Sequence, residues 1–165
     1  MNPKVLIVMG SDSDCPVLEE TAKILEHFAI PYEMRIASAH RSPRKTADLV
    51  EGAADRGIKV IIAAAGLAAH LPGVVAAGTI LPVIGVPMGG GPLNGVDALY
   101  SIVQMPGGIP VATTAIGRAG AKNAALLATQ ILALGDTALA GKLLAYREKM
   151  ATDVEAKDRK LQERA

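Results

Sequence analysis

A series of short apolar segments, each followed by glycine or small polar residues, constrains the fold of this chain most. Residues 4–9 end in Val-Leu-Ile-Val-Met, and residues 59–65 and 81–86 are similarly apolar. Apolar runs without polar alternation are typical of strands buried on both faces. Two further runs, residues 31–37 and 111–115, complete a set of five expected strands. Segments of helical periodicity separate these runs, which favours a parallel sheet covered by helices on both faces.

The expected helices follow from their start and stop signals. Pro16 begins the first of them, and Ser42 and Pro43 have the character of an N-cap and first helical residue. The remaining helices are expected over residues 42–56, 73–78, 95–104 and 123–134. For a chain of this length the economical architecture is a flavodoxin-like three-layer αβα sandwich, with a five-stranded parallel sheet in the order 2-1-3-4-5.

The composition bounds the class of protein. At 165 residues the chain suits a single domain, 1–165, with an α/β core over residues 1–135. Half of the residues are apolar but only three Tyr and one Phe are aromatic, so the core is aliphatic. A net charge of +1 gives no support to nucleic acid or an anionic membrane as a partner. The single Cys15 excludes an internal disulfide, and no apolar run is long and uncharged enough to span a bilayer, so we expect a cytoplasmic protein.

The last segment, residues 136–165, is expected to form one long amphipathic C-terminal helix. Its apolar positions recur at steps of mostly three and four: Leu139, Leu143, Tyr146, Met150, Val154 and Leu161. A frayed, solvated tail is one interpretation of this mostly charged segment. We favour the other, in which the apolar stripe packs on a neighbouring subunit and the protein is a homo-oligomer.

Three turns with unusual residues fall at the switch point of the expected sheet, where ligands of such folds bind. They are residues 10–15, 38–41 and 66–73. The first, Gly10-Ser11-Asp12-Ser13-Asp14, lacks the Gly-Lys-Ser/Thr ending of a Walker A loop. Its hydroxyls and amides nevertheless lie at a helix N-terminus, which suits an anion such as a phosphate monoester. Taken alone, the same residues are also ordinary helix caps.

Two histidines and an arginine lie in the other turns. His40 can move a proton near neutral pH, and Arg41 offers a planar fork to phosphate or carboxylate. A solvated turn is the plain alternative for this pair, as a hydrogen-bonded structural histidine is for His70. No metal is expected, because the chain has neither an H-x-x-x-H motif nor a Cys/His cluster. Cys15 has no histidine or basic residue beside it in the sequence, so a role as nucleophile is disfavoured.

Taken together, five ordered motifs resemble the N5-carboxyaminoimidazole ribonucleotide mutase (PurE) family of purine biosynthesis. The resemblance covers roughly residues 4–135, and its motifs are Gly10-Ser11-Asp12-Ser13-Asp14, Ser38-Ala39-His40-Arg41, Ala68-Ala69-His70-Leu71-Pro72-Gly73, Leu93-Asn94-Gly95 and the run from Ser101 to Thr113. It implies a flavodoxin-like fold, an octamer that shares active-site residues between subunits, and an isomerase without a cofactor. The His-Leu-Pro-Gly sequence is like that of the mutase class and unlike that of related carboxylases.

The resemblance also implies a role for each matching residue. The substrate would be an aminoimidazole ribonucleotide whose carboxylate migrates from the exocyclic nitrogen to ring carbon C4, through decarboxylation and recarboxylation. His40 would transfer the proton, and the other positions would bind the substrate: Ser11, Ser13 and Asp14 at the ribose phosphate end, Arg41 on the phosphate, Ser38 and Ala39 along the pocket, and Gly66 to Leu71, including His70, around the imidazole and carbon dioxide.

The sequence departs from the family pattern at three places. Leu67 stands where the family usually has glycine, Gly89-Gly90-Gly91 replaces a more polar loop, and Cys15 stands where tryptophan is common. These departures bear on the rim of the site more than on the overall assignment. Two other hypotheses stand beside the mutase. One is a carboxylase that acts directly on aminoimidazole ribonucleotide and carbon dioxide, and the other is a non-catalytic flavodoxin-like module that binds a nucleotide.

Overall fold

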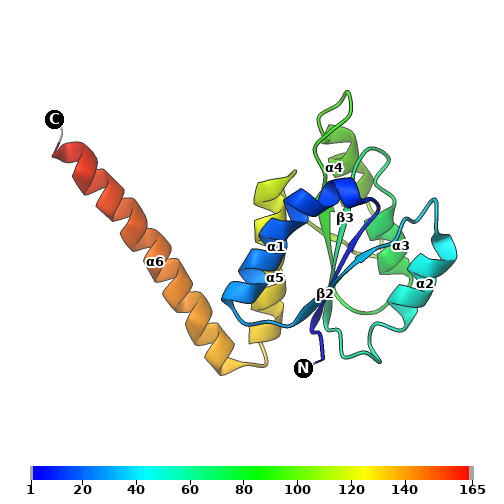
Figure 1. Cartoon of the computed structure of the whole chain (residues 1–165), viewed down its shortest axis with the longest axis horizontal. Helices are drawn as coiled ribbons and strands as arrows, with labels where there is room; N and C mark the ends of the chain where they lie inside the picture. The colour runs from blue at the N-terminus through cyan, green and yellow to red at the C-terminus, as the bar shows by residue number, and fades with distance from the viewer. Residues whose placement is uncertain (1, 164–165) are drawn as a thin grey trace. The chain divides into compact units, whose positions relative to one another are not determined.

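A five-stranded parallel sheet forms the centre of the computed structural model, which describes residues 2–163 (Figure 1). Its order is β2-β1-β3-β4-β5, so the predicted flavodoxin-like α/β fold is confirmed. The central strands are apolar throughout and fully buried, as their sequences predict. The strands are β1 (Val5–Met9), β2 (Tyr32–Ile36), β3 (Val60–Ala65), β4 (Val83–Pro87) and β5 (Ala112–Thr113).

Helices cover both faces of this sheet. Side chains of β1 and β3 on one face, such as Leu6 and Ile61, share a buried cluster with α2, α3 and α4. The other face is covered by α1 and α5, which lie side by side in Figure 1. The helices are the 3-10 helix η1 (Asp12–Asp14) and α1 (Cys15–His27), α2 (Pro43–Glu51), α3 (Leu71–Ala77), α4 (Val96–Val103), α5 (Arg118–Ala133) and α6 (Thr137–Gln162).

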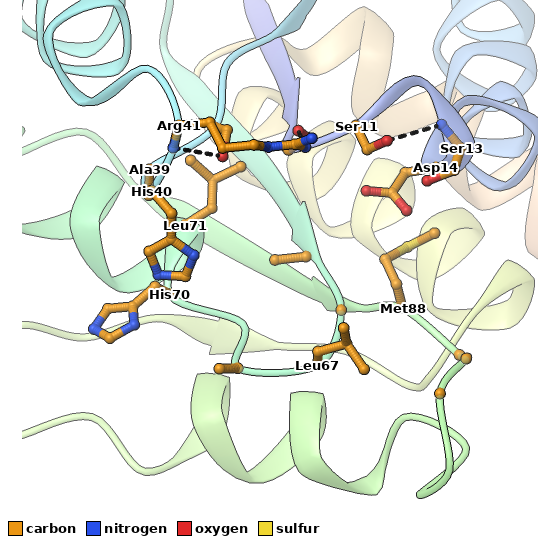
Figure 2. A pocket seen from close by; sticks show the side chains of 18 residues that line it. Ser11, Ser13, Asp14, Ala39, His40, Arg41, Leu67, His70, Leu71 and Met88 are labelled. Atoms are coloured by element: carbon orange, nitrogen blue, oxygen red, sulfur yellow. Dashed lines mark hydrogen bonds between the residues drawn. The ribbon is translucent and has the colours of Figure 1, made fainter.

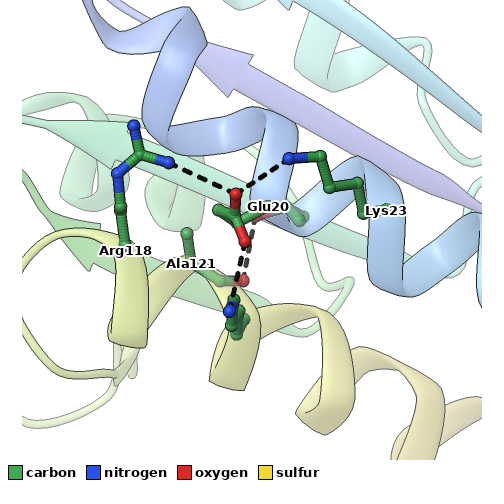
Figure 3. Close-up of polar contacts among 6 residues, drawn as sticks. Glu20, Lys23, Arg118 and Ala121 are labelled. Atoms are coloured by element: carbon green, nitrogen blue, oxygen red, sulfur yellow. Dashed lines mark hydrogen bonds and ion pairs between the residues drawn. The ribbon is translucent and has the colours of Figure 1, made fainter.

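A polar cluster joins α1 to α5 at the edge of their interface (Figure 3). The carboxylate of Glu20 pairs with Lys23 at 3.0 Å, Arg118 at 3.2 Å and Lys122 at 3.2 Å. Hydrogen bonds from Lys23 and then Lys122 hold the pKa of Glu20 below its usual value. Beside this cluster the buried Thr21 hydroxyl donates to the Ala121 carbonyl at 2.9 Å. The two helices are therefore joined by directional bonds.

The strand register brings the carboxyl ends of four strands to one edge of the sheet. Met9, the last residue of β1, lies opposite Ile36 and Ala64, and Ala65 lies opposite Pro87. The chain therefore leaves β1, β2, β3 and β4 at nearly the same level. The four loops that follow these strands begin next to one another, as the topology predicts for a ligand site.

Several predicted boundaries were wrong, each for a local physical reason. The second helix ends at Glu51 and not at Arg56, because Gly52 caps it and turns follow. The third begins at Leu71 and not at Gly73, since Pro72 fits the first helical turn. The fifth expected strand, residues 111–115, shortens to Ala112–Thr113, which pairs on one side only, with β4.

The early start of α5 is a further correction, because a helix was expected only from residue 123. It begins at Arg118, just after Gly117, whose φ of +73° lies in the left-handed region. Gly120 lies within the first turn, where a Cβ atom would overlap the carbonyl of Ala115. This glycine permits close packing, and it does not break the helix.

The chain divides into two units, residues 1–129 and 130–165, the second of which contains α6. Asp136 caps α6 by accepting a hydrogen bond from the Leu139 amide at 3.0 Å. The helix ends at Gln162, within the predicted range of residues 136–165, whose last two residues lie outside the described part of the chain. In residues 2–163, no helix combines the length and apolar character that a membrane span requires.

Candidate active site

A cavity of about 450 Å³ opens at the carboxyl edge of the sheet, between the loops that follow β1, β2, β3 and β4 (Figure 2). We call them the β1 loop (residues 10–14), the β2 loop (38–42), the β3 loop (66–70) and the β4 loop (88–91). All ten predicted site residues line this cavity: Ser11, Ser13, Asp14, Ser38, Ala39, His40, Arg41, Gly66, His70 and Leu71. The structure therefore brings together residues that lie far apart in the sequence.

The β1 loop folds around the hydroxyl of Ser11. That hydroxyl accepts a hydrogen bond from the Ser13 amide at 3.3 Å and donates to the Asp12 carboxylate at 3.1 Å. Ser11 thereby caps η1, which leads directly into α1. The loop places small hydroxyl side chains and helix N-terminal amides beside the cavity, an arrangement that favours an anion.

The β2 loop is held by hydrogen bonds between its two ends. The Ser42 hydroxyl accepts from the Ser38 amide at 3.0 Å and donates to the Ser38 carbonyl at 3.2 Å, while the Ser38 hydroxyl accepts from the Arg41 amide at 3.2 Å. Ser42 occupies the predicted N-cap position of α2, but its hydroxyl makes no capping bond. It stabilises the turn that presents His40 and Arg41 instead.

Arg41 joins the β2 loop to the β1 loop. Its Nη2 donates to the carbonyl of Gly10 at 2.7 Å, and its side chain extends toward Ser11 in Figure 2. The guanidinium group is exposed at the cavity, and a planar group with five N–H donors has others left for a ligand. Positive charge and the hydroxyls of Ser11 and Ser13 thus lie in the same part of the site.

The imidazole rings of His40 and His70 lie next to each other at the wall of the cavity. Their ring centroids lie 5.2 Å apart with an interplanar angle of 77°, an edge-to-face arrangement. Both side chains are exposed to the cavity, and His70 directly precedes α3. The contact between these histidines could not be predicted from the sequence. The strands that precede them, β2 and β3, are not adjacent, because β1 lies between them.

Asp14 is the one carboxylate among the residues that line the cavity. Partial burial raises its pKa, and the nearby charge of Asp12 adds to this effect, against hydrogen bonds from Ser13 and Ser11 that lower it. The raised pKa reduces the negative charge that Asp14 would hold against an anion. The carboxyl group is also suited to accept hydrogen bonds from sugar hydroxyls.

The β3 and β4 loops form an apolar side of the cavity. Met88, which sequence reasoning did not assign to the site, lies here because its amide donates to the Ala65 carbonyl at 2.9 Å and extends the β3–β4 pairing. The position of Met88 directly after the apolar strand β4 was the sequence signal that could have assigned it to the site. Cys15 and the motif from Leu93 to Gly95 are not among the lining residues.

The geometry defines an α/β protein with a cavity at the switch point of a parallel sheet, lined at one end by hydroxyl and guanidinium groups and at its wall by a pair of histidines. Among the described residues, no group of three His, Cys, Asp or Glu side chains could hold a metal ion. The polar side chains that line the site carry imidazole, carboxyl, hydroxyl and guanidinium groups.

Comparison with known proteins assigns the family. The sequence model of the AIR carboxylase family matches residues 4–153, so the chain belongs to this family. The chain is 55% identical over 161 residues to the N5-carboxyaminoimidazole ribonucleotide mutase of Pyrococcus horikoshii, covering 98% of this chain and 90% of that protein. It is 57% identical over 148 residues to the mutase of Bacillus subtilis, with 90% and 91% covered.

The fold comparison agrees. A crystal structure of Treponema denticola PurE superposes with a TM-score of 0.86 at 35% identity, covering 96% of this chain and 98% of that one. The predicted resemblance is thus confirmed, as is the expectation of an enzyme of the mutase type at the level of the family.

Proposed function

We propose that this chain converts N5-carboxyaminoimidazole ribonucleotide to 4-carboxy-5-aminoimidazole ribonucleotide in purine (IMP) biosynthesis. The observation that carries the proposal is the convergence of all ten residues expected from the mutase motifs on one cavity. Curated relatives at 53–57% identity, from Thermotoga maritima to Bacillus subtilis, are named for this mutase, which supports the same assignment.

In this proposal the cavity holds the ribonucleotide by its two ends. Arg41 and the hydroxyls of Ser11 and Ser13 bind the phosphate, and Asp14 accepts from the ribose hydroxyls. Ser38 and Ala39 line the middle of the pocket, while Gly66, His70 and Leu71 enclose the imidazole and the migrating carboxylate. The Arg41 bond to Gly10 fixes the guanidinium before the substrate arrives, so little side-chain entropy is lost on binding.

His40 is the general acid and base of the proposed reaction. As the carbamate C–N bond breaks, its electron pair returns to the exocyclic nitrogen, which takes a proton from His40. Ring carbon C4 then attacks the released carbon dioxide, and the tetrahedral carbon returns its proton to His40. One imidazole can fill both roles because the two proton transfers are opposite and sequential. The steps balance as an isomerisation, with no oxidation or reduction.

The test uses two mixtures, one with N5-carboxyaminoimidazole ribonucleotide and one with the uncarboxylated ribonucleotide and low bicarbonate. The C4-carboxylated product is followed by its absorbance. The mutase forms product in the first mixture, and His40→Asn abolishes turnover while His27→Asn, at an exposed histidine of α1, does not. Full turnover by His40→Asn would overturn the role of His40.

A direct carboxylase is the second candidate, because the matching family is described by that activity. It would form product from the uncarboxylated ribonucleotide and bicarbonate alone. Product in the second mixture only would establish the carboxylase and exclude the mutase. Tight ribonucleotide binding without product in either mixture would identify a non-catalytic binding module.

We also propose that the protein is a cytoplasmic homo-oligomer, with the octamer as the expected state. In this proposal residues 1–165 form a single domain, and the C-terminal helix packs against a neighbouring subunit through its apolar stripe. Exposed apolar side chains of that stripe, such as Met150 and Val154, support this proposal. Light scattering on the full chain is expected to give a mass several-fold above that of the monomer, and a monodisperse monomer would contradict it.

A further inference from the structure

The motif from Leu93 to Gly95 lies outside the cavity lining, and the proposed reaction makes no use of it. It belongs to the turn that joins the β4 loop to α4. The Asn94 amide donates to the Gly91 carbonyl at 3.4 Å, and the Val96 amide donates to the Leu93 carbonyl at 3.0 Å. Asn94 and Gly95 both have left-handed backbone, with φ of +51° and +88°, which these two residue types tolerate well. This accounts for the backbone of the motif but leaves the asparagine side chain without a role.

Two groups of this turn have no hydrogen-bond partner in residues 2–163. One is the backbone amide of Gly95, the residue before α4, and the other is the exposed side-chain amide of Asn94. The backbone nitrogen that follows an asparagine can close a five-membered ring on the side-chain Cγ atom. A glycine nitrogen is the least shielded for this reaction, because glycine has no Cβ atom. The two unbonded groups are therefore a reactive pair.

The two other asparagines of the chain lack a free neighbouring amide. Asn2 precedes Pro3, which has no backbone N–H. Asn123 lies within α5 and precedes Ala124, which is fully buried and whose amide belongs to the hydrogen bonds of that helix. Within the described residues, Asn94 thus differs from both in being followed by an unbonded N–H.

We propose that Asn94 is a deamidation site of the folded protein, at which aspartate and isoaspartate accumulate with age. The Gly95 nitrogen attacks Cγ of Asn94 and gives up its proton, which reaches the leaving nitrogen through water. A new C–N bond forms, the bond from Cγ to the side-chain nitrogen breaks, and that nitrogen leaves as ammonia. Water then opens the cyclic imide at either of its two carbonyls, which gives aspartate or isoaspartate. Water is the only co-reactant, and no oxidation or reduction occurs.

The attack requires rotation about the Cα–C bond of Asn94, and so a local opening of the turn. Three observations favour such an opening. The Asn94 side chain is exposed, and the hydrogen bond from its backbone amide to Gly91 is long at 3.4 Å. Gly90, in the same segment, has no atom within 4 Å of its Cβ position, so few contacts hold the chain there. Segments of this kind open with a small free-energy cost relative to global unfolding.

Isoaspartate at position 94 would disturb the cavity wall. It carries the main chain through Cβ and so adds a methylene between residues 94 and 95. Gly95 packs closely on the β4 loop, since a Cβ atom there would lie 2.9 Å from the Met88 carbonyl oxygen and 3.1 Å from Gly89 Cα. Met88 and Gly89 both line the cavity. The longer main chain is therefore expected to displace the β4 loop and to weaken substrate binding, a consequence that rests on the proposed function.

The test ages the full chain in mildly alkaline buffer, folded or in urea, and measures the products at Asn94 and Asn123 by peptide mass spectrometry. Enzymatic methylation by an isoaspartate methyltransferase distinguishes isoaspartate from aspartate. In urea both asparagines are free to react. In the folded chain Asn94 is expected to convert within several-fold of its rate in urea, whereas Asn123 is expected to stay intact. Protection of Asn94 as complete as that of Asn123 would overturn the proposal.

Two variants separate the modification from its effect on the cavity. Asn94→Gly tolerates the positive φ and cannot form the imide, so its affinity for the C4-carboxylated ribonucleotide should survive ageing. The native protein should lose affinity several-fold as isoaspartate accumulates. Asn94→Asp carries the new charge without the added methylene, so the fresh variant should bind as the fresh native protein does. A loss in fresh Asn94→Asp equal to that of the aged native protein would overturn displacement by the longer main chain.

Hydrogen exchange gives a readout that does not depend on the proposed function. The Met88 amide, which bonds to the Ala65 carbonyl at 2.9 Å, should exchange several-fold faster in aged native protein than in aged Asn94→Gly. If fresh native protein does not bind the ribonucleotide, the proposed function is wrong, and exchange at Met88 still tests the modification. If isoaspartate forms while exchange and affinity stay unchanged, the link from Asn94 to the cavity is wrong.

Discussion

Arg41 offers the sharpest test of how the site binds its substrate. Replacement by methionine keeps the length of the apolar stem and removes the guanidinium, together with its 2.7 Å hydrogen bond to the Gly10 carbonyl. The bond joins exposed groups, so its loss should cost about 1 kcal/mol of folding stability at most and leave the variant folded. A larger change in the free energy of ligand binding can then be attributed to the lost contact between Arg41 and the ligand.

The size of that effect follows from the geometry. A hydrogen bond to a charged group contributes about 1.5–3 kcal/mol. Arg41 is exposed, which places the expected loss toward the lower end of that range. Since 1.4 kcal/mol is a tenfold change in affinity, Arg41→Met should weaken binding of the C4-carboxylated ribonucleotide by about ten- to thirtyfold.

A thermodynamic cycle isolates the phosphate. Calorimetry gives the affinities of the native protein and of Arg41→Met for the ribonucleotide and for its nucleoside, which lacks the phosphate. Removal of the phosphate from the ligand should weaken binding to the native protein far more than binding to Arg41→Met. Arg44→Met, an exposed arginine of α2 outside the cavity lining, should behave as the native protein. An equal loss in the native protein and in Arg41→Met would refute phosphate binding by Arg41.

Three further predictions concern stability and pH. Asp14→Asn should raise the free energy of unfolding near neutral pH, because a carboxyl with a raised pKa destabilises the fold as pH rises through that pKa. This gain in stability should vanish in acid, where the carboxyl is protonated in both states, and a gain that persists in acid would contradict the prediction. Glu20→Gln should lower the melting temperature at neutral pH but not below the folded-state pKa of Glu20, because a carboxyl with a lowered pKa stabilises the fold only above that pKa. An equal fall in melting temperature at both pH values would exclude the ion pairs as the cause. Gly120→Ala should cost about 1–3 kcal/mol in chemical denaturation, because its Cβ would overlap the Ala115 carbonyl, whereas Gly107→Ala, with open space around its Cβ, should cost nothing; similar values for the two would refute close packing.

The core of the fold could be predicted because its strands are buried on both faces. The apolar runs that contain β1 and β3 have the composition of strands covered on both faces, and they are buried along their whole length. The ends of helices were harder to predict, because a glycine can either end a helix or allow close packing within one. Gly52 ends α2, whereas Gly120 lies inside α5 and serves close packing. Only the tertiary neighbours distinguish these two cases.

The candidate site could be located from topology, since the loops at one sheet edge must converge. His40 and Arg41 lie in the predicted turn, and the cavity gathers them with Ser11. The contacts within the site could not be predicted, because they join separate loops. The contact of Leu67 with Gly91, for example, depends on two backbone conformations that no sequence pattern specifies.

The register of the sheet has a consequence for folding. Three walls of the cavity follow β1, β2 and β3, but the fourth exists only after β4 has paired with β3 through Ala65 and Pro87. Substrate binding is therefore coupled to completion of the sheet, and a bound ligand should stabilise the whole first unit rather than one loop. At a ligand concentration a hundredfold above Kd, that stabilisation is about 2.7 kcal/mol. Slowed hydrogen exchange in β4, far along the chain from Ser11, would be its signature.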